Sequence, residues 1–132
     1  VEAVYVTARK DGTGQPLSGD KSWRVRVPAG LPVGGFWSLT MYEQTDDGRL
    51  FFVPNDLNRF AVGNRSRHLR PERDGSIELF IQNTKPSGER VVNWLPAPKG
   101  RFVLIYRAYL PGAGLLDGSA RLPPVMEGEL IP

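Results

Sequence analysis

The residues with the most evident chemical potential gather in one basic segment, LNRFAVGNRSRHLRPER, which runs from Leu57 to Arg73. Against the single acid Glu72 it has five arginines, a local charge of +4, and the only histidine of the chain, His68. Arginine holds carboxylates and phosphates through two parallel hydrogen bonds. Runs of charged residues usually form solvated surface, so the segment is either a solvated basic loop or a site for a carboxylate, a phosphate or an acidic sugar. The arginines are Arg59, Arg65, Arg67, Arg70 and Arg73.

A second notable stretch, VVNWLPAPKGRF (91–102), sets a tryptophan between an asparagine and a proline-rich turn and then leads into an apolar strand. Pro96 and Pro98 lack the N–H that a ladder would use, so they fit a rigid corner before that strand. Trp94 is large enough to close the end of a sandwich, and its indole N–H needs a partner. Asn93 can tie down a loop with its side-chain amide. The stretch therefore indicates a structural corner, with direct ligand contact as the alternative.

One further arginine, Arg107, interrupts an otherwise apolar strand, RFVLIYRAYL (101–110). A buried arginine must be paired with an opposite charge. We therefore predict a carboxylate partner for Arg107, namely Asp56, Glu43 or Asp117; the alternative is that Arg107 emerges at the end of the strand. Arg107 completes the set of candidate ligand-binding residues. That set comprises Asn58, Arg59, Asn64, Arg65, Asn93, Trp94 and Arg107.

Catalytic chemistry finds little support in the residues. A serine triad would need His68 as its base, and the Gly-x-Ser-x-Gly pattern of a nucleophile elbow is missing. One histidine and no cysteine do not supply the ligands of a zinc site. We therefore expect no catalytic residue, no metal and no cofactor. The alternative is a hydrolase, directed at a carbohydrate or an ester, that uses His68 or a carboxylate pair. The acids considered for such a pair are Glu43, Asp74 and Glu78.

Composition bounds the class of protein. The chain has 132 residues, 15 glycines, 12 prolines and no cysteine, which suits a single domain, residues 1–132, of short strands joined by turns and excludes disulfides. No apolar run of about twenty residues is present, so no membrane span is expected in this chain. The net charge is +3, but the aromatic residues fall mostly on apolar strand faces rather than among the arginines. This distribution argues against nucleic acid as a partner.

Alternation of apolar and polar residues predicts the strands that must position these side chains. In SWRVRVP, FWSLTMYE and SIELFIQ every second residue is apolar on one side, as in strands with one buried face. RFVLIYRAYL is apolar on both faces, so we place it centrally. The segment NTKPSGER (83–90) is predicted to be a polar loop, and Asp46-Asp47-Gly48 a hairpin turn. The pattern predicts an all-β fold, and it favours an antiparallel two-sheet β-sandwich, with a closed barrel as the alternative. Its strands are expected at 3–10, 22–28, 36–43, 49–53, 60–62, 76–82, 101–110 and 125–131, the last at an edge.

Five motifs in a fixed order carry a resemblance to a known family: FWSLTMYE, VPNDLNRFAVGNR, DGSIELFIQ, NWLPAPKGRFVLIYRAYLP and LLDGSARLPPV. Over residues 3–125 they are similar to the bacterial family of domain of unknown function 1214. The resemblance implies a jelly-roll sandwich of the viral-coat and nucleoplasmin type. It also implies either a C-terminal domain beside a second uncharacterised domain, numbered 1254, or a short protein with an N-terminal membrane or export segment. The family often has tyrosine where Phe60 stands here, so no hydroxyl role carries over, and the family has no established catalytic residues.

The resulting hypothesis is a non-catalytic binding or assembly module of a bacterial envelope protein. Its ligand would be a small anion or an acidic glycan, held by the arginine- and asparagine-rich loop. The alternative among non-enzymatic roles is contact with protein, as a homo-oligomer or with a partner domain, since arginine is enriched at interfaces. Because the chain starts at Val1 without a methionine, we expect the short form with its leader or anchor removed, in the periplasm or cell envelope.

Overall fold

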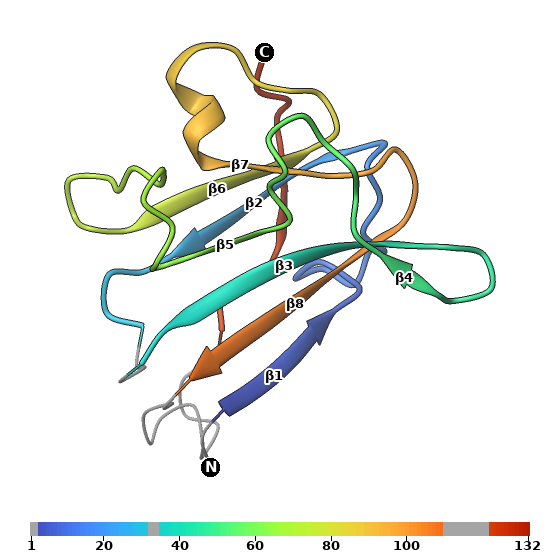
Figure 1. The fold of residues 1–132 in the computed structure, drawn as a ribbon, viewed down its shortest axis with the longest axis horizontal. Helices are drawn as coiled ribbons and strands as arrows, with labels where there is room; N and C mark the ends of the chain where they lie inside the picture. Colours follow the sequence, from blue (N-terminus) through green and yellow to red (C-terminus); the bar gives the residue numbers. More distant parts are fainter. Residues whose placement is uncertain (1–2, 32–34, 110–121) are drawn as a thin grey trace.

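The computed structural model describes residues 3–31, 35–109 and 122–132, and within them the chain is all-β apart from one short helix (Figure 1). All the strands predicted from the alternation form, with ends shifted by a few residues. The hairpin turn at Asp46-Asp47-Gly48 also forms, closed by a 2.9 Å bond from the N–H of Thr45 to the carbonyl of Arg49. The elements are β1 (Ala3–Ala8), β2 (Ser22–Val27), β3 (Trp37–Gln44), β4 (Leu50–Phe51), β5 (Ala61–Gly63), β6 (Ile77–Gln82), η1 (Gly88–Asn93), β7 (Trp94–Pro96), β8 (Phe102–Tyr109) and β9 (Met126–Gly128).

The strands form two sheets. The five-stranded sheet has the order β1-β8-β3-β4, with β5 also paired to β3, and the four-stranded sheet has the order β7-β6-β2-β9. β8 lies between β1 and β3, as predicted for a strand that is apolar on both faces (Figure 1). The prediction of wholly antiparallel sheets is wrong at one pair, because β6 and β7 run parallel. Two parallel neighbours need a connection that carries the chain back along the first strand before the second begins. The segment that contains η1 is that connection between β6 and β7.

The inward side chains of both sheets share one core. On β2 the alternating residues Trp23, Val25 and Val27 are buried, and on β6 Leu79 and Ile81 are buried. The core cluster joins these residues to the inward residues of β3 and β8. The predicted two-sheet arrangement is therefore confirmed, while the jelly-roll path stays a prediction. The inward residues on β3 and β8 are Trp37, Leu39, Met41, Phe102, Leu104 and Tyr106.

Residues 91–96 form the end of η1 and a short strand that the sequence did not predict, and bends at Lys99 and Gly100 then lead into β8, where the corner was expected. η1 ends at Asn93, and Trp94–Pro96 then runs along β6 as the outermost strand of its sheet. Pro96 is tolerated there because the outermost strand needs no N–H for a further neighbour. η1 also replaces part of the predicted polar loop. Its six residues have no side-chain cap at Ser87 and are too few to show helical periodicity, so the sequence gives no signal for it.

Candidate functional site

The outer face of the five-stranded sheet carries aromatic side chains with an arginine at their centre. The register places Tyr5 of β1 and Ser38 of β3 opposite Arg107 of β8. These positions alternate with the buried Tyr106 and Ala108, so their side chains point away from the core. We name this surface the aromatic face. Its members are Tyr5, Phe36, Tyr42, Phe52, Phe60, Arg65, Arg107 and Tyr109, linked by the contacts described below.

Arg107 bonds hydroxyl groups at the centre of this face. Its Nη1 donates to the Thr40 hydroxyl at 2.9 Å, and its Nη2 donates to the Tyr42 hydroxyl at 3.3 Å. Its guanidinium carbon lies 5.9 Å from the ring centroid of Tyr5. Arg107 is half-buried, so it keeps contact with water and does not need a charged partner to offset full desolvation.

The carboxylate partner predicted for Arg107 is wrong for two of the three candidates. Asp56 pairs with Lys85 at 2.8 Å. Glu43 makes no ion pair with Arg107 within the described residues. The reason lies in the register, because the neighbours of Arg107 on the outward side of β3 are Ser38 and Thr40. The third candidate, Asp117, lies outside the described residues.

Aromatic rings extend the face on one side of Arg107. Tyr42 stacks on Phe52, with ring centroids 5.3 Å apart and an interplanar angle of 17°. Phe52 in turn packs on Phe60 at 5.0 Å. Phe52 is 53% exposed although its ring is anchored on both sides. A contiguous patch of exposed apolar surface, as opposed to a single exposed residue, often marks a place of contact.

Rings also extend the face on the other side of Arg107. Tyr5, 61% exposed, meets Tyr109 edge to face at 6.4 Å. A side-chain hydrogen bond with Tyr109 raises the pKa of the Tyr5 hydroxyl above its ordinary value. Tyr109 stacks on Phe36 at 4.1 Å, and the guanidinium carbon of Arg65 lies 3.7 Å from the Phe36 centroid. Arg65, one of the candidates, therefore lies at the margin of the aromatic face.

Arg59, in the basic segment, is tied to the backbone of the 91–94 region. Its Nη1 donates to the carbonyl oxygens of Val91 at 2.7 Å and of Trp94 at 2.8 Å. Partial burial lowers the pKa of the guanidinium below its ordinary value. Asn55 holds the turn beneath it, because its amide accepts from the N–H of Arg59 and donates to the carbonyl of Arg59, both at 2.9 Å. The structure thus brings Arg59 and Trp94 together, as the candidate set supposed, through a structural contact.

Asn93 and Trp94 have the fixing roles predicted from their types. The Asn93 amide accepts from the N–H of Arg70 at 2.8 Å and donates to the carbonyls of Arg70 at 2.9 Å and Glu78 at 3.1 Å. We name this set of bonds the Asn93 clasp. Trp94 is buried, and its indole N–H donates to the carbonyl of Gln82 at 2.8 Å.

The remaining candidates are dispersed. Asn58 is exposed at a left-handed turn position, with φ of 48°. The Asn64 side chain accepts from the N–H of Trp37 at 3.1 Å. Asn58 and Arg59 line a hollow of about 400 Å³, whereas Asn93 lines a different hollow. The candidate set is therefore divided between the aromatic face, the basic segment and a second sheet.

His68 lines the same hollow as Asn58, and its Nδ1 donates to the carbonyl of Val92 at 2.7 Å. A backbone carbonyl thus orients this ring, where a catalytic triad would have a carboxylate. Within the described residues no three acidic or histidine side chains are placed to share a metal ion. In the same ranges no helix has both the length and the apolar character needed to cross a membrane.

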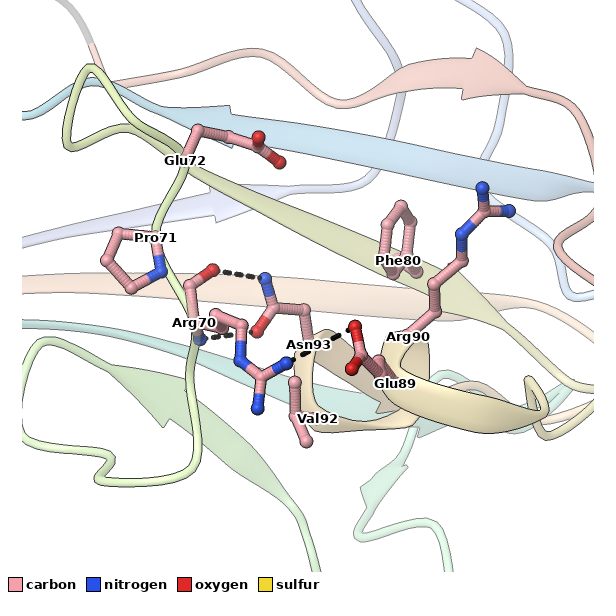
Figure 2. Close-up of a pocket in the computed structure, with 8 residues that line it drawn as sticks. All are labelled: Arg70, Pro71, Glu72, Phe80, Glu89, Arg90, Val92 and Asn93. Atoms are coloured by element: carbon pink, nitrogen blue, oxygen red, sulfur yellow. Dashed lines mark hydrogen bonds and ion pairs between the residues drawn. The ribbon is translucent and has the colours of Figure 1, made fainter.

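A groove on the outer face of the four-stranded sheet was missed by the sequence analysis. A hollow of about 220 Å³ beside the Asn93 clasp adjoins a second of about 440 Å³, and Glu72, Phe80 and Arg90 line both. Figure 2 shows the Phe80 ring between the carboxylate of Glu72 and the guanidinium of Arg90. We name this the Phe80 groove. The signal was present in SIELFIQ, where Phe80 is an aromatic residue on the outward side of an alternating strand.

These features define an all-β domain of two sheets whose outer faces carry the surfaces available for contact. The chain belongs to the family described as protein of unknown function (DUF1214), whose model matches residues 2–113. No curated protein matches the chain.

Two solved structures share the fold. The VPA0106 protein from Vibrio parahaemolyticus is 27% identical, with a TM-score of 0.83, and the match covers 98% of this chain and 31% of that one. An uncharacterised protein from Burkholderia cenocepacia is 16% identical, with a TM-score of 0.58, over 99% of this chain and 31% of that one. The second likeness shows the fold alone. The chain spans about a third of the length of either relative.

Proposed function

We propose that the domain is a non-catalytic binding module that holds an acidic glycan on the aromatic face. The observation that carries the proposal is Arg107, which lies between exposed aromatic rings, bonds two hydroxyls and has no carboxylate partner in the described residues. A uronic acid carboxylate can accept two parallel N–H bonds from such a guanidinium. The C–H groups on the face of a sugar ring pack well on exposed rings such as Tyr5 and Phe52.

The shape and charge of the aromatic face favour an extended sugar over the other anions considered. A small anion would contact Arg107 and leave the exposed surface of Tyr5 and Phe52 unused. A nucleic acid strand needs a cation for many of its phosphates, whereas this face has Arg107 and Arg65 as its arginines. A surface that binds an acidic glycan needs both aromatic rings for the sugar faces and a few widely spaced cations for the carboxylates.

Assembly with another protein is the competing role, because tyrosine, phenylalanine and arginine are also enriched at protein interfaces.

We further propose that the protein is located in the periplasm or cell envelope and that its strands follow a jelly-roll path. The envelope location fits a module that meets polysaccharide outside the cytoplasm.

The test is electrophoresis of the folded domain in native gels that contain polygalacturonate, alginate or neutral dextran. We expect retardation by the acidic polymers alone. Arg107→Gln should weaken retention about tenfold, the effect of losing a bond to a charged group. Phe52→Ala should weaken it by a similar factor, because it removes an aromatic packing surface. The matched controls are Arg49→Gln and Phe51→Ala. Phe51 is 46% exposed and has Arg49 over its ring at 5.5 Å, but it pairs with Glu43 on the other side of the strand.

Two results would contradict this function. Equal losses in Arg107→Gln and Arg49→Gln would mean general charge attraction to a basic protein. The absence of retardation by every acidic polymer, together with concentration-dependent self-association that Phe52→Ala abolishes, would assign the face to assembly.

A further inference from the structure

The floor of the Phe80 groove is a fixed aromatic ring. Phe80 points outward from β6, between the buried Leu79 and Ile81. The guanidinium carbon of Arg24 lies 5.0 Å from its ring centroid. Arg24 is itself held by Glu78 at 3.0 Å and by the carbonyl of Glu129 at 3.0 Å. Arg24 thus packs over the Phe80 ring, and the part of this half-buried ring that stays uncovered faces the two hollows.

Most charges around this floor are neutralised in pairs. Arg24 pairs with Glu78, and Arg70 pairs with Glu89 at 3.4 Å (Figure 2). The two charged groups left over in the smaller hollow are Glu72 and Arg90, which make no ion pair within the described residues.

The two leftover charges have opposite signs and lie on opposite sides of the Phe80 ring (Figure 2). Glu129 lines only the larger hollow, which is negative on balance. A simple anion would be attracted to Arg90 but repelled by Glu72. A simple cation would be attracted to Glu72 but repelled by Arg90. A ligand with both charges satisfies both groups at once.

We propose that the Phe80 groove binds a zwitterionic α-amino acid with an apolar side chain. Its carboxylate would accept paired N–H bonds from Arg90, and its ammonium would bond Glu72. Its side chain would pack on the Phe80 ring. The smaller hollow, at about 220 Å³, is below the range of roughly 300–1,000 Å³ that suits drug-sized ligands, so it fits a molecule of few heavy atoms.

This site is separate from the proposed glycan surface. It lies on the other sheet, combines both signs of charge and uses none of the members of the aromatic face. Either proposal can therefore fail while the other stands.

The test is a titration of the isotope-labelled domain followed by amide chemical shifts in NMR. The probes are L-phenylalanine, N-acetyl-L-phenylalanine and L-phenylalanine amide, which have both charges, the carboxylate alone and the ammonium alone. We expect the free amino acid to shift the amides around Phe80 and to bind about tenfold more tightly than either derivative, since each derivative lacks one charged bond. Glu72→Gln should abolish the preference over the N-acetyl form, and Arg90→Gln the preference over the amide.

Arg67→Gln is the matched control, because Arg67 is exposed and lines neither hollow of the groove. It should leave all three affinities unchanged. Equal binding of the three probes, or no shift around Phe80 with any of them, would overturn the proposal. Retention on acidic polysaccharide should be the same in Glu72→Gln and the wild type, and amino acid binding should survive Arg107→Gln.

Discussion

Arg59 in the basic segment and Arg107 on the aromatic face have different roles: the first bonds the backbone, and the second bonds side chains. In the segment 57–73, Arg59 is bonded to the carbonyls of Val91 and Trp94. Arg70 is fixed through its backbone by the Asn93 clasp. On the aromatic face Arg107 stands alone in an apolar strand, and its guanidinium bonds the hydroxyls of two side chains. The guanidinium of Arg59 is thus bonded into the backbone framework, whereas that of Arg107 bonds side chains on a sheet face.

The difference follows from backbone hydrogen bonding. Every N–H and C=O group taken from water must find a partner, and irregular segments lack a ladder to supply it. Side-chain amides supply those partners to the backbone of Arg59 and Arg70, and the guanidinium of Arg59 supplies them to the carbonyls of Val91 and Trp94. The backbone of β8 is already paired to β1 and β3. The side chain of Arg107 is therefore available for another task.

The largest effect is expected from breaking the Asn93 clasp. Asn93→Ala removes three bonds from a buried amide and leaves the N–H of Arg70 and the carbonyl of Glu78 without this partner. We expect the free energy of unfolding to fall by about 2–4 kcal/mol, measured by urea denaturation. The control is Asn58→Gly, where glycine accepts the φ of 48° without strain, so the change should stay within about 0.5 kcal/mol. A loss in Asn93→Ala no larger than in this control would contradict the structural role of the clasp.

A smaller loss of stability is expected when Arg59 loses its charge. Arg59→Met keeps an apolar stem but removes the bonds to Val91 and Trp94. We expect the unfolding free energy to fall by about 1–2 kcal/mol in the same denaturation experiment, because the bonds are charge-assisted but only partly shielded from water. Arg67→Met, at an exposed position of the same segment, should change it by less than about 0.5 kcal/mol. If both variants lose the same stability, Arg59 is no more structural than its neighbours.

The sequence predicts which strand faces are buried and that Asn93 fixes a loop, but it does not predict which residues Asn93 bonds. Alternation in SWRVRVP and SIELFIQ predicted buried faces, which Val25, Leu79 and Ile81 confirm, because a half-buried strand must alternate. The tying role of Asn93 followed from its amide. Its partners did not, because Arg70 and Glu78 meet Asn93 only through the fold.

The aromatic face could not be predicted either. Its rings come from segments far apart in the chain, and alternation shows which side of a strand faces inward but not which strands become neighbours. Phe52 and Phe60, for example, meet across a turn-rich segment that has no period to read.

The smallest change in stability, and the sharpest test of the comparison, is expected at Arg107. Arg107→Met removes two bonds, one to the half-exposed Tyr42 hydroxyl and one to the buried Thr40 hydroxyl, and leaves the backbone pairing of β8 intact. Methionine also packs well in an apolar strand, so we expect the unfolding free energy to change by no more than about 0.5–1 kcal/mol. The same variant should lose retention on acidic polysaccharide, whereas Arg59→Met should lose stability and keep retention. This opposite pattern separates an arginine that holds the fold from one that faces a ligand. A loss at Arg107 that matches or exceeds the loss at Arg59 would place both arginines in the framework and remove the reason to expect a carboxylate at the aromatic face.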